Sequence, residues 1–155
     1  MGSVLVIGGG AAGLAAAIAA AECGDTVTVT EKMDRVGRKI LATGNGRCNL
    51  MNTGAPRYPG NAAFAADVLS RCGAEAQKAF WEHLGLRLRQ EEAGRVYPVS
   101  SQASSVLDAL RLQLTALHVR VVTGVSITAL NRESDGWTAL SADGQRFRAN
   151  RVIIS

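Results

Sequence analysis

The sequence predicts an α/β fold with a central parallel sheet, and three observations near the amino terminus support this prediction. The apolar run Val4–Ile7 has the composition of a buried strand and leads into the glycine-rich segment Gly8–Gly13. The alanine-rich stretch Ala11–Cys23 favours a helix that can lie close to a sheet. Thr26–Thr30 then alternates like a second strand and leads into Glu31. This order of strand, glycine turn, helix, strand and acid is typical of a βαβ unit that binds a dinucleotide.

Each glycine has a separate role in such a turn. Gly8 allows the tight turn out of the first strand, and Gly10 lets a pyrophosphate approach a backbone that carries no side chain. Gly13 allows the helix to pack closely on the sheet, while the free N–H groups at the positive end of the helix face the phosphates. The glycine spacing alone is weak evidence, because glycines also interrupt ordinary loops. The flanking strands, helix and acid make a dinucleotide site the better interpretation.

Glu31 narrows the choice of nucleotide. A carboxylate at the end of the second strand accepts hydrogen bonds from the ribose hydroxyls beside the adenine, and it repels a 2′-phosphate. NADP is therefore a poor candidate for this site, whereas FAD and NAD both carry the required ribose. A glutamate that merely caps the end of an exposed strand is the non-functional alternative.

The rest of the chain predicts short helices and strands in a mixed order. Residues 32–60 are rich in glycine, asparagine and basic side chains and lack hydrophobic periodicity, so we expect a long functional loop with one helical turn. Two helices are expected at about Asn61–Arg71 and Ala74–Leu84, and a third is capped by Ser101 or Ser104 and runs to about Leu117. The expected strands are Leu86–Gln90 and Arg95–Tyr97 as a hairpin, Val119–Thr123, a β-meander of Ile127–Asn131, Trp137–Ala142 and Gln145–Arg148, and finally Arg151–Ile154.

Composition argues against several classes of function. The chain has 155 residues, of which 47% are hydrophobic, enough for one core of ordinary size. Its net charge is +4, but only 5% of its residues are aromatic, and a nucleic-acid-binding protein should show a longer basic stripe with interleaved aromatics. We therefore expect no nucleic-acid partner. We expect no membrane partner either, because the apolar stretch Ala11–Ala21 is too short to span a bilayer.

The cysteines and histidines predict neither a metal site nor a catalytic group. Cys23, Cys48 and Cys72 form no pair with C-x-x-C spacing, so we expect no metal. An odd number of cysteines and the lack of a signal peptide favour a cytoplasmic location. His83 and His118 pair with no serine, cysteine or carboxylate motif, and the catalytic residues stay unknown.

A second glycine-rich segment, GRKILATGNGRCN, runs from Gly37 to Asn49. Its glycines let the main chain approach a ligand. Arg38, Lys39 and Arg47 can offset pyrophosphate charge, and the asparagines offer amide donors and acceptors. These residues indicate a ligand-binding loop, with a flexible basic surface loop as the alternative.

Taken together, these segments resemble the BaiN/RdsA-like NAD(P)/FAD-dependent oxidoreductases, also called the aminoacetone oxidase family. The matching pieces are the glycine turn, the pair Glu31-Lys32, the second glycine-rich segment, and GRVYPVSSQASSVLDAL from Gly94 to Leu110. The second glycine-rich segment is highly specific for this family, and the resemblance extends over essentially the whole chain. It implies that residues 1–155 form a Rossmann-like FAD-binding domain of glutathione-reductase type, with a central parallel sheet and a β-meander.

The resemblance also implies a cofactor and the residues that hold it. FAD is the expected cofactor, with NAD(P)H as a candidate co-substrate and a small organic molecule as the substrate. The glycine turn would hold the pyrophosphate, Glu31 the ribose, and a backbone group of Val125 the adenine edge, while the second loop would extend toward the flavin. The expected cofactor-binding residues are Gly8, Gly10, Ala11, Ala12, Gly13, Glu31, Lys32, Arg38, Lys39, Gly44, Asn45, Gly46, Arg47, Cys48, Asn49 and Val125.

The resemblance further implies that the chain is the amino-terminal part of a longer flavin-dependent oxidoreductase. Family members carry a substrate domain and a return to the FAD domain, and we expect both to lie outside residues 1–155. We therefore expect the 155-residue piece alone to be inactive. An NAD-linked dehydrogenase domain and a non-catalytic nucleotide-binding fragment are the alternatives. The β-meander after Val125 favours FAD, because a simple NAD domain would continue with alternating strands and helices.

Overall fold

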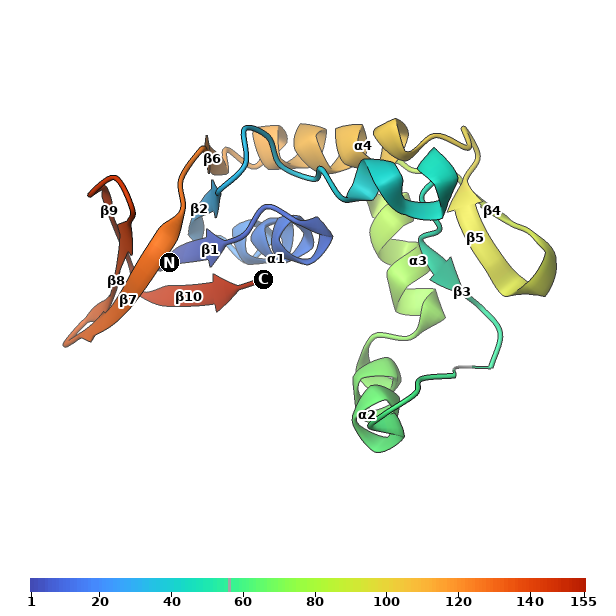
Figure 1. The fold of residues 1–155 in the computed structure, drawn as a ribbon. Coiled ribbons are helices and arrows are strands. Elements are labelled where there is room, and N and C mark those ends of the chain that lie inside the picture. Colours follow the sequence, from blue (N-terminus) through green and yellow to red (C-terminus); the bar gives the residue numbers. More distant parts are fainter. Residues whose placement is uncertain (56) are drawn as a thin grey trace. The chain divides into compact units, whose positions relative to one another are not determined.

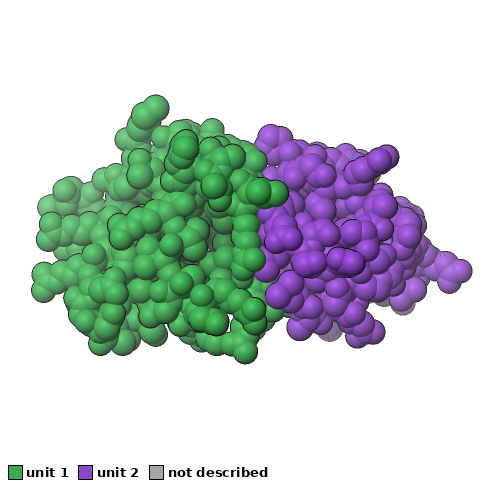
Figure 2. Space-filling view, turned by 90° about the horizontal axis from the view of Figure 1, so that it is seen from above, with its two compact units in different colours: residues 1–39, 110–155 green, residues 40–109 purple. Residues whose placement is uncertain are grey.

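The chain divides into two compact units, coloured separately in Figure 2. The structure is a computed structural model that describes residues 1–55 and 57–155. Unit 1 combines Met1–Lys39 with Leu110–Ser155, and unit 2 is the continuous segment Ile40–Ala109. The first strands of unit 1 are therefore separated in sequence from its last strands by the whole of unit 2.

Unit 1 contains a four-stranded parallel sheet (Figure 1). The strand order is β10-β1-β2-β6, where the strands are β1 (Ser3–Ile7), β2 (Thr26–Glu31), β6 (Arg120–Thr123) and β10 (Arg151–Ile154). In register, Val6 of β1 lies beside Val29 on one side and Ile153 on the other. Strand β1 is a nearly continuous apolar run, as expected where both faces of a parallel sheet are covered, whereas β2 alternates threonine with valine. The predicted central parallel sheet is confirmed.

The two faces of this sheet are covered by different elements. Helix α1 (Ala11–Glu22) contacts β1 and β2 and buries Leu14, Ala17 and Ile18 completely. Its many alanines allow this close approach, because a methyl group keeps the helix axis near the sheet. Leu5 of β1 belongs to a different buried cluster, formed with Val125, Ala139, Phe147 and Ala149. Since side chains alternate along a strand, Leu5 points away from the face on which its buried neighbours lie.

The second buried cluster includes residues of the predicted β-meander. The meander consists of three antiparallel strands in the order β7 (Ile127–Glu133), β8 (Gly136–Ser141) and β9 (Arg146–Ala149). The predicted turn at Asp143-Gly144 joins β8 to β9, with Gly144 at φ +87°. The Asp143 carboxylate accepts hydrogen bonds from the Ser141 hydroxyl and from the Gln145 side chain. Both bonds lower the pKa of Asp143, and the bond from Ser141 has the larger effect.

Unit 2 is built from short elements around a three-stranded antiparallel sheet of order β3-β5-β4. The predicted hairpin is present as β4 and β5, and the predicted helical turn of the long loop is the 3-10 segment η1. Strand β3 has only two residues, too few for a sequence signal, and was not predicted. The elements are η1 (Ile40–Gly46), β3 (Met51–Asn52), α2 (Ala62–Arg71), α3 (Ala74–His83), β4 (Leu88–Gln90), η2 (Glu92–Gly94), β5 (Arg95–Pro98) and the start of α4 (Ala103–Ala116).

The buried residues of unit 2 gather on β5 and α4. Val96 and Tyr97 of β5 and Val106 and Leu107 of α4 are all buried, whereas α2 and α3 contain no fully buried residue. Helix α4 continues past Leu110, where unit 1 resumes. Among the residues that the structure describes, no helix is long and apolar enough to cross a membrane.

Candidate functional site

The glycine turn after β1 is closed so tightly that three of its glycines, Gly8, Gly9 and Gly13, leave no room for a β-carbon. Gly8 has φ +113°, and its N–H donates to the carbonyl of Thr30 at 2.8 Å. A Cβ on Gly13 would lie 2.0 Å from the carbonyl oxygen of Gly8, far inside contact distance. The first turn of α1 therefore touches the backbone of the glycine turn directly. This close approach is what the sequence predicted for Gly13.

Gly10 is different, because the space beside it is open. A Cβ built on Gly10 would meet no atom within 4 Å. Gly10 is also the N-cap of α1, where no side chain caps the helix and no acidic residue stands in the first turn. Gly10, Ala11 and Ala12 are all exposed. The positive end of α1 thus faces open space with free N–H groups, which is the arrangement that binds a phosphate group.

Glu31 closes the other side of this turn. Its Oε2 accepts a hydrogen bond from the N–H of Gly9 at 2.8 Å, and its Oε1 accepts one from the N–H of Met33 at 2.8 Å. A carboxylate offers about four lone-pair positions, so each oxygen can accept a further hydrogen bond. The half-buried Glu31 is therefore held in place by the backbone and still has acceptor capacity for a ligand.

Gly9 is a functional position that the sequence analysis missed. A Cβ on Gly9 would lie 2.6 Å from Cγ1 of Val36 and 3.1 Å from Oε2 of Glu31. Its carbonyl also accepts from the N–H of Gly37 at 2.7 Å. The G-x-G spacing specifies Gly8 and Gly10 but leaves the residue between them open. The run of three glycines was the one sequence signal that could have indicated a role for Gly9.

The other predicted residues of unit 1 lie near this turn in different ways. The N–H of Val125 donates to the carbonyl of Glu31 at 2.9 Å, which brings the end of β2 and the residue after β6 together. Lys32, Arg38 and Lys39 are exposed, and within residues 1–55 and 57–155 they form no ion pair. Their charges are therefore available to a ligand.

The second predicted loop belongs to unit 2 from Ile40 to Asn49, and the backbone of this part is unusual. Four of its residues have φ in the left-handed region: Gly44 at +54°, Asn45 at +54°, Gly46 at +81° and Cys48 at +57°. A Cβ on Gly44 would lie 2.7 Å from the N–H nitrogen of Asn49, so the loop also folds closely on itself. Cys48, one of the expected cofactor-binding residues, is buried.

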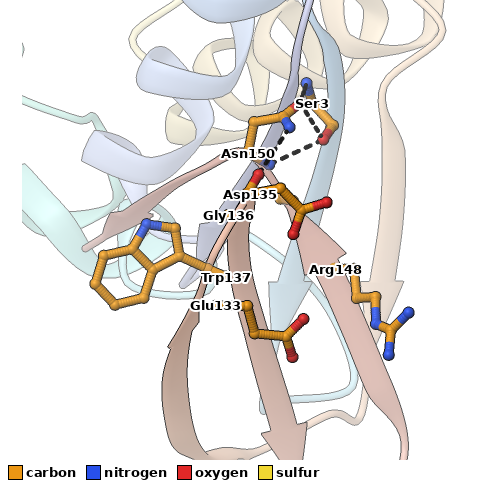
Figure 3. A pocket seen from close by; sticks show the side chains of 8 residues that line it. Ser3, Glu133, Asp135, Gly136, Trp137, Arg148 and Asn150 are labelled. Carbon is orange, nitrogen blue, oxygen red and sulfur yellow. Dashed lines mark hydrogen bonds between the residues drawn. The ribbon is translucent and has the colours of Figure 1, made fainter.

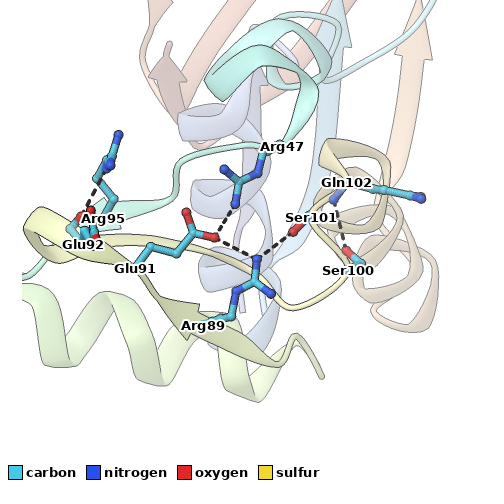
Figure 4. Close-up of polar contacts among 8 residues, drawn as sticks. All are labelled: Arg47, Arg89, Glu91, Glu92, Arg95, Ser100, Ser101 and Gln102. Atoms are coloured by element: carbon cyan, nitrogen blue, oxygen red, sulfur yellow. Dashed lines mark hydrogen bonds and ion pairs between the residues drawn. The ribbon is translucent and has the colours of Figure 1, made fainter.

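Arg47 is the one basic residue of Gly44–Asn49, and it is engaged within unit 2. Its guanidinium carbon lies 4.0 Å from the centroid of the Tyr97 ring, and its Nη2 forms an ion pair with Oε1 of Glu91. Figure 4 shows this pair together with Arg89, which also donates to Glu91, at 2.7 Å. Glu91 and Tyr97 were not predicted, because they lie more than forty residues from Arg47 in the sequence. Tyr97 belongs to the matching segment Gly94–Leu110, but that segment assigned it no contact with the loop.

A small polar hollow elsewhere in unit 1 does not fit a dinucleotide. It has a volume of about 150 Å³, and Ser3, Asp135, Trp137 and Asn150 are among its lining residues (Figure 3). Ligand pockets usually measure roughly 300–1,000 Å³. The hollow adjoins Ser3 at the start of β1, whereas the glycine turn follows the end of the same strand. Within the part of the chain that the structure describes, no group of three or more His, Cys, Asp or Glu side chains is arranged to hold a metal.

The sequence matches the model of one protein family, described as the HI0933-like protein Rossmann domain, over residues 2–155. The chain belongs to this family. The match confirms the family resemblance recognised from the two glycine-rich segments. Together with the parallel sheet, it also confirms the predicted fold class, a Rossmann-like FAD-binding domain.

Two curated relatives show how much of a longer protein the chain represents. It is 44% identical to a 3-dehydro-bile acid delta(4,6)-reductase of Clostridium scindens, over 100% of this chain and 39% of that protein. It is 27% identical to a ribosomal RNA dihydrouridine synthase of Haemophilus influenzae, over 83% of this chain and 32% of that protein. The chain thus spans less than two fifths of the length of these relatives.

Solved structures share the fold at low sequence identity. The crystal structure of Thermovibrio ammonificans THI4 matches with a TM-score of 0.63 at 14% identity, covering 99% of this chain and 55% of that one. NikD, an unusual amino acid oxidase essential for nikkomycin biosynthesis, matches with a TM-score of 0.53 at 20% identity, covering 100% of this chain and 51% of that one. At these identities the likeness concerns the fold alone.

Proposed function

We propose that this chain is the FAD-binding part of a flavin-dependent oxidoreductase and that its glycine turn holds the FAD pyrophosphate. The observation that carries the proposal is the open space at Gly10, at the uncapped positive end of α1. The next residue toward the amino terminus, Gly9, is bonded to the carboxylate that would hold the ribose. N–H donors for a phosphate and a carboxylate acceptor for the ribose hydroxyls therefore lie side by side, joined by the hydrogen bond between Gly9 and Glu31.

Each predicted residue has a role in this proposal. The N–H groups from Gly10 to Gly13 bind the pyrophosphate, and Glu31 accepts from the ribose hydroxyls. The N–H of Val125 is already engaged, so its carbonyl oxygen is the backbone group for the adenine edge. Lys32, Arg38 and Lys39 offset phosphate charge, and the Gly44–Asn49 loop extends toward the flavin.

When bound, FAD supplies the hydride or electron transfer, and the chain need only bind and orient it. Glu31 carries the nucleotide preference, because its carboxylate repels a 2′-phosphate. The same residue accepts N–H bonds from Gly9 and Met33, so it cannot swing away from such a phosphate without losing both. We therefore propose NAD(P)H only as a co-substrate of the complete protein, bound outside this site.

The activities of the two relatives support a substrate class. A delta(4,6)-reductase of 3-dehydro bile acids acts on carbon–carbon double bonds next to a ketone, and uridine differs from dihydrouridine by one reduced double bond next to a carbonyl. We propose that the complete protein reduces a carbon–carbon double bond conjugated to a carbonyl. A small molecule is the proposed substrate, because the relative at 44% identity acts on bile acids and the RNA-modifying relative is only 27% identical.

An FAD titration of the complete protein tests the cofactor assignment. Gly10→Val fills the open space without backbone strain, because Gly10 has an ordinary φ of −78°. We expect it to weaken FAD binding at least about tenfold, since a side chain would stand where the pyrophosphate must lie. Ala19→Val adds a similar bulk to an exposed position of the same helix and serves as the control. Wild-type affinity in folded Gly10→Val would refute the phosphate assignment.

Two alternatives make different predictions for the same protein. An NAD-linked dehydrogenase would release NAD rather than FAD when the purified protein is denatured, and mass spectrometry of the extract distinguishes the two. A non-catalytic nucleotide-binding module would bind FAD without turnover even as the complete protein. We propose that the 155-residue chain alone shows no turnover, because it represents 39% of the length of its reductase relative.

A further inference from the structure

The Arg47 side chain is held from two sides within unit 2. One face of its guanidinium lies over the Tyr97 ring, at 4.0 Å from the ring centroid. One edge forms the ion pair with Glu91, as Figure 4 shows. Tyr97 is buried on β5, and the Arg47 and Glu91 side chains are 36% and 26% exposed. Such a half-buried, stacked and paired guanidinium has lost most of its freedom to reach another partner.

Glu91 is itself fixed by a second arginine. Nη2 of Arg89 donates to Oε1 of Glu91 at 2.7 Å and to Oγ of Ser101 at 3.0 Å. Arg89 lies on β4, and Ser101 lies between β5 and α4. The backbone N–H of Glu91 also donates to the carbonyl of Arg95 at 2.7 Å across the hairpin. The carboxylate that holds Arg47 is therefore anchored to the rigid part of unit 2.

The loop that carries Arg47 needs such an anchor. Asn45 and Cys48 occupy the left-handed region without being glycines, and each such residue costs about 1–2 kcal/mol. Few internal hydrogen bonds offset this strain. The N–H of Arg47 donates to Gly44 at 3.1 Å, and the N–H of Cys48 donates to Thr43 at 3.0 Å. A strained loop persists only where its surroundings hold it, and strain of this kind is common in ligand-binding segments.

We propose that Glu91 is a positioning residue, which acts through Arg47 to hold the Gly44–Asn49 loop in its cofactor-binding conformation. This inference rests on the proposed function for what the loop binds. The same inference assigns Arg47 a structural role in the loop. Because Glu91 compensates its charge, Arg47 anchors the loop to the β4–β5 hairpin and need not itself contact the cofactor.

Hydrogen exchange of the complete protein without FAD tests the anchor separately from cofactor binding. In Glu91→Gln we expect the amides of Arg47 and Cys48 to exchange about tenfold faster, because local opening of the loop becomes easier. Arg71→Gln is the matched control, since it removes an exposed ion pair with Asp67 on α2 and leaves Arg47, Arg89 and Glu91 unchanged. Its loop amides should exchange within about twofold of the wild-type rate. Arg47→Met breaks the same pair from the loop side and should reproduce the faster exchange.

An FAD titration of the same variants then tests the consequence. We expect Glu91→Gln to weaken FAD binding about three- to tenfold and to change the flavin absorbance spectrum, because the loop no longer holds one conformation. In an Arg47→Met background, Glu91→Gln should have no further effect, since it acts only through Arg47. Wild-type exchange in both single variants, or additive effects in the double variant, would overturn the positioning role. A wild-type protein that binds no FAD but shows the expected exchange differences would overturn the proposed function and leave the anchor in place.

Discussion

The backbone N–H of Gly9 donates a 2.8 Å hydrogen bond to Oε2 of Glu31, which joins the glycine turn to the end of β2. The two residues are 22 positions apart in the sequence, and each belongs to a different half of the dinucleotide motif. Their direct contact means that the phosphate-binding turn and the ribose-binding carboxylate are one structural unit. A change at Glu31 should therefore alter both the affinity for a nucleotide and the shape of the turn.

Glu31→Gln should weaken FAD binding by at least about tenfold. Glu31 accepts one N–H bond on each oxygen, whereas a glutamine amide has one oxygen and one NH2 group. The NH2 group must face one of the two N–H donors, and such an unsatisfied pair costs about 1–3 kcal/mol. Titration of the complete protein with FAD measures the loss. Glu133→Gln makes the same charge change at an exposed site of unit 1 and should bind like the wild type.

Gly13→Ala and Gly10→Ala should separate stability from cofactor binding. The new methyl group on residue 13 would overlap the backbone oxygen of Gly8, which cannot move without opening the turn. We expect a loss of about 1–3 kcal/mol in the free energy of unfolding, as for other overpacked sites. Gly10→Ala meets no protein atom and should keep the wild-type Tm while its FAD affinity falls. Equal Tm values for both variants would contradict this account of the turn.

The ion pair at Glu91 should make stability depend on pH. The hydrogen bond from Arg47, followed by that from Arg89, lowers the pKa of the Glu91 carboxyl in the folded protein. A carboxyl with a lowered folded-state pKa stabilises the fold above its unfolded-state pKa of about 4.3, and this contribution disappears as the pH falls through the lowered value. Glu91→Gln should thus have a lower urea midpoint than the wild type at pH 7, and the difference should vanish in strong acid. A difference that persists unchanged at pH 2 would show that the charge of Glu91 is not the cause.

Thr138→Val should stabilise unit 1. The Oγ1 atom of Thr138 is buried in β8 and has no hydrogen-bond partner among the described residues. Valine has nearly the same shape, and it removes the cost of burying an unsatisfied hydroxyl, which is about 1–3 kcal/mol. We expect a higher Tm in a thermal melt of the complete protein. Thr26→Val, at an exposed position of β2 whose hydroxyl forms no hydrogen bond among the described residues, should leave Tm nearly unchanged. A lower Tm in Thr138→Val would mean that the hydroxyl has a partner.

The sequence was most informative where structure depends on neighbouring residues. The turn between β1 and α1 is local, so its glycines predicted both the conformation at Gly8 and the close contact at Gly13. The meander was recognisable because its strands follow each other and meet at an Asp-Gly turn. The anchor between Arg47 and Glu91 was not recognisable, because pairing across 44 positions depends on the tertiary fold. The role of Gly9 was also missed, since it depends on where Val36 and Glu31 come to lie.

The division of unit 1 in the sequence affects how the protein can fold during synthesis. Strand β1 lies between β2 and β10 in the sheet, and its first residue, Ser3, contacts Asn150, 147 positions later. A growing chain completes the continuous unit 2 while β1 still lacks its neighbour on one side. The apolar edge of β1 is then open to wrong pairing until β10 leaves the ribosome. Closure across so long a span is slow, so nascent chains of this family should depend on chaperones.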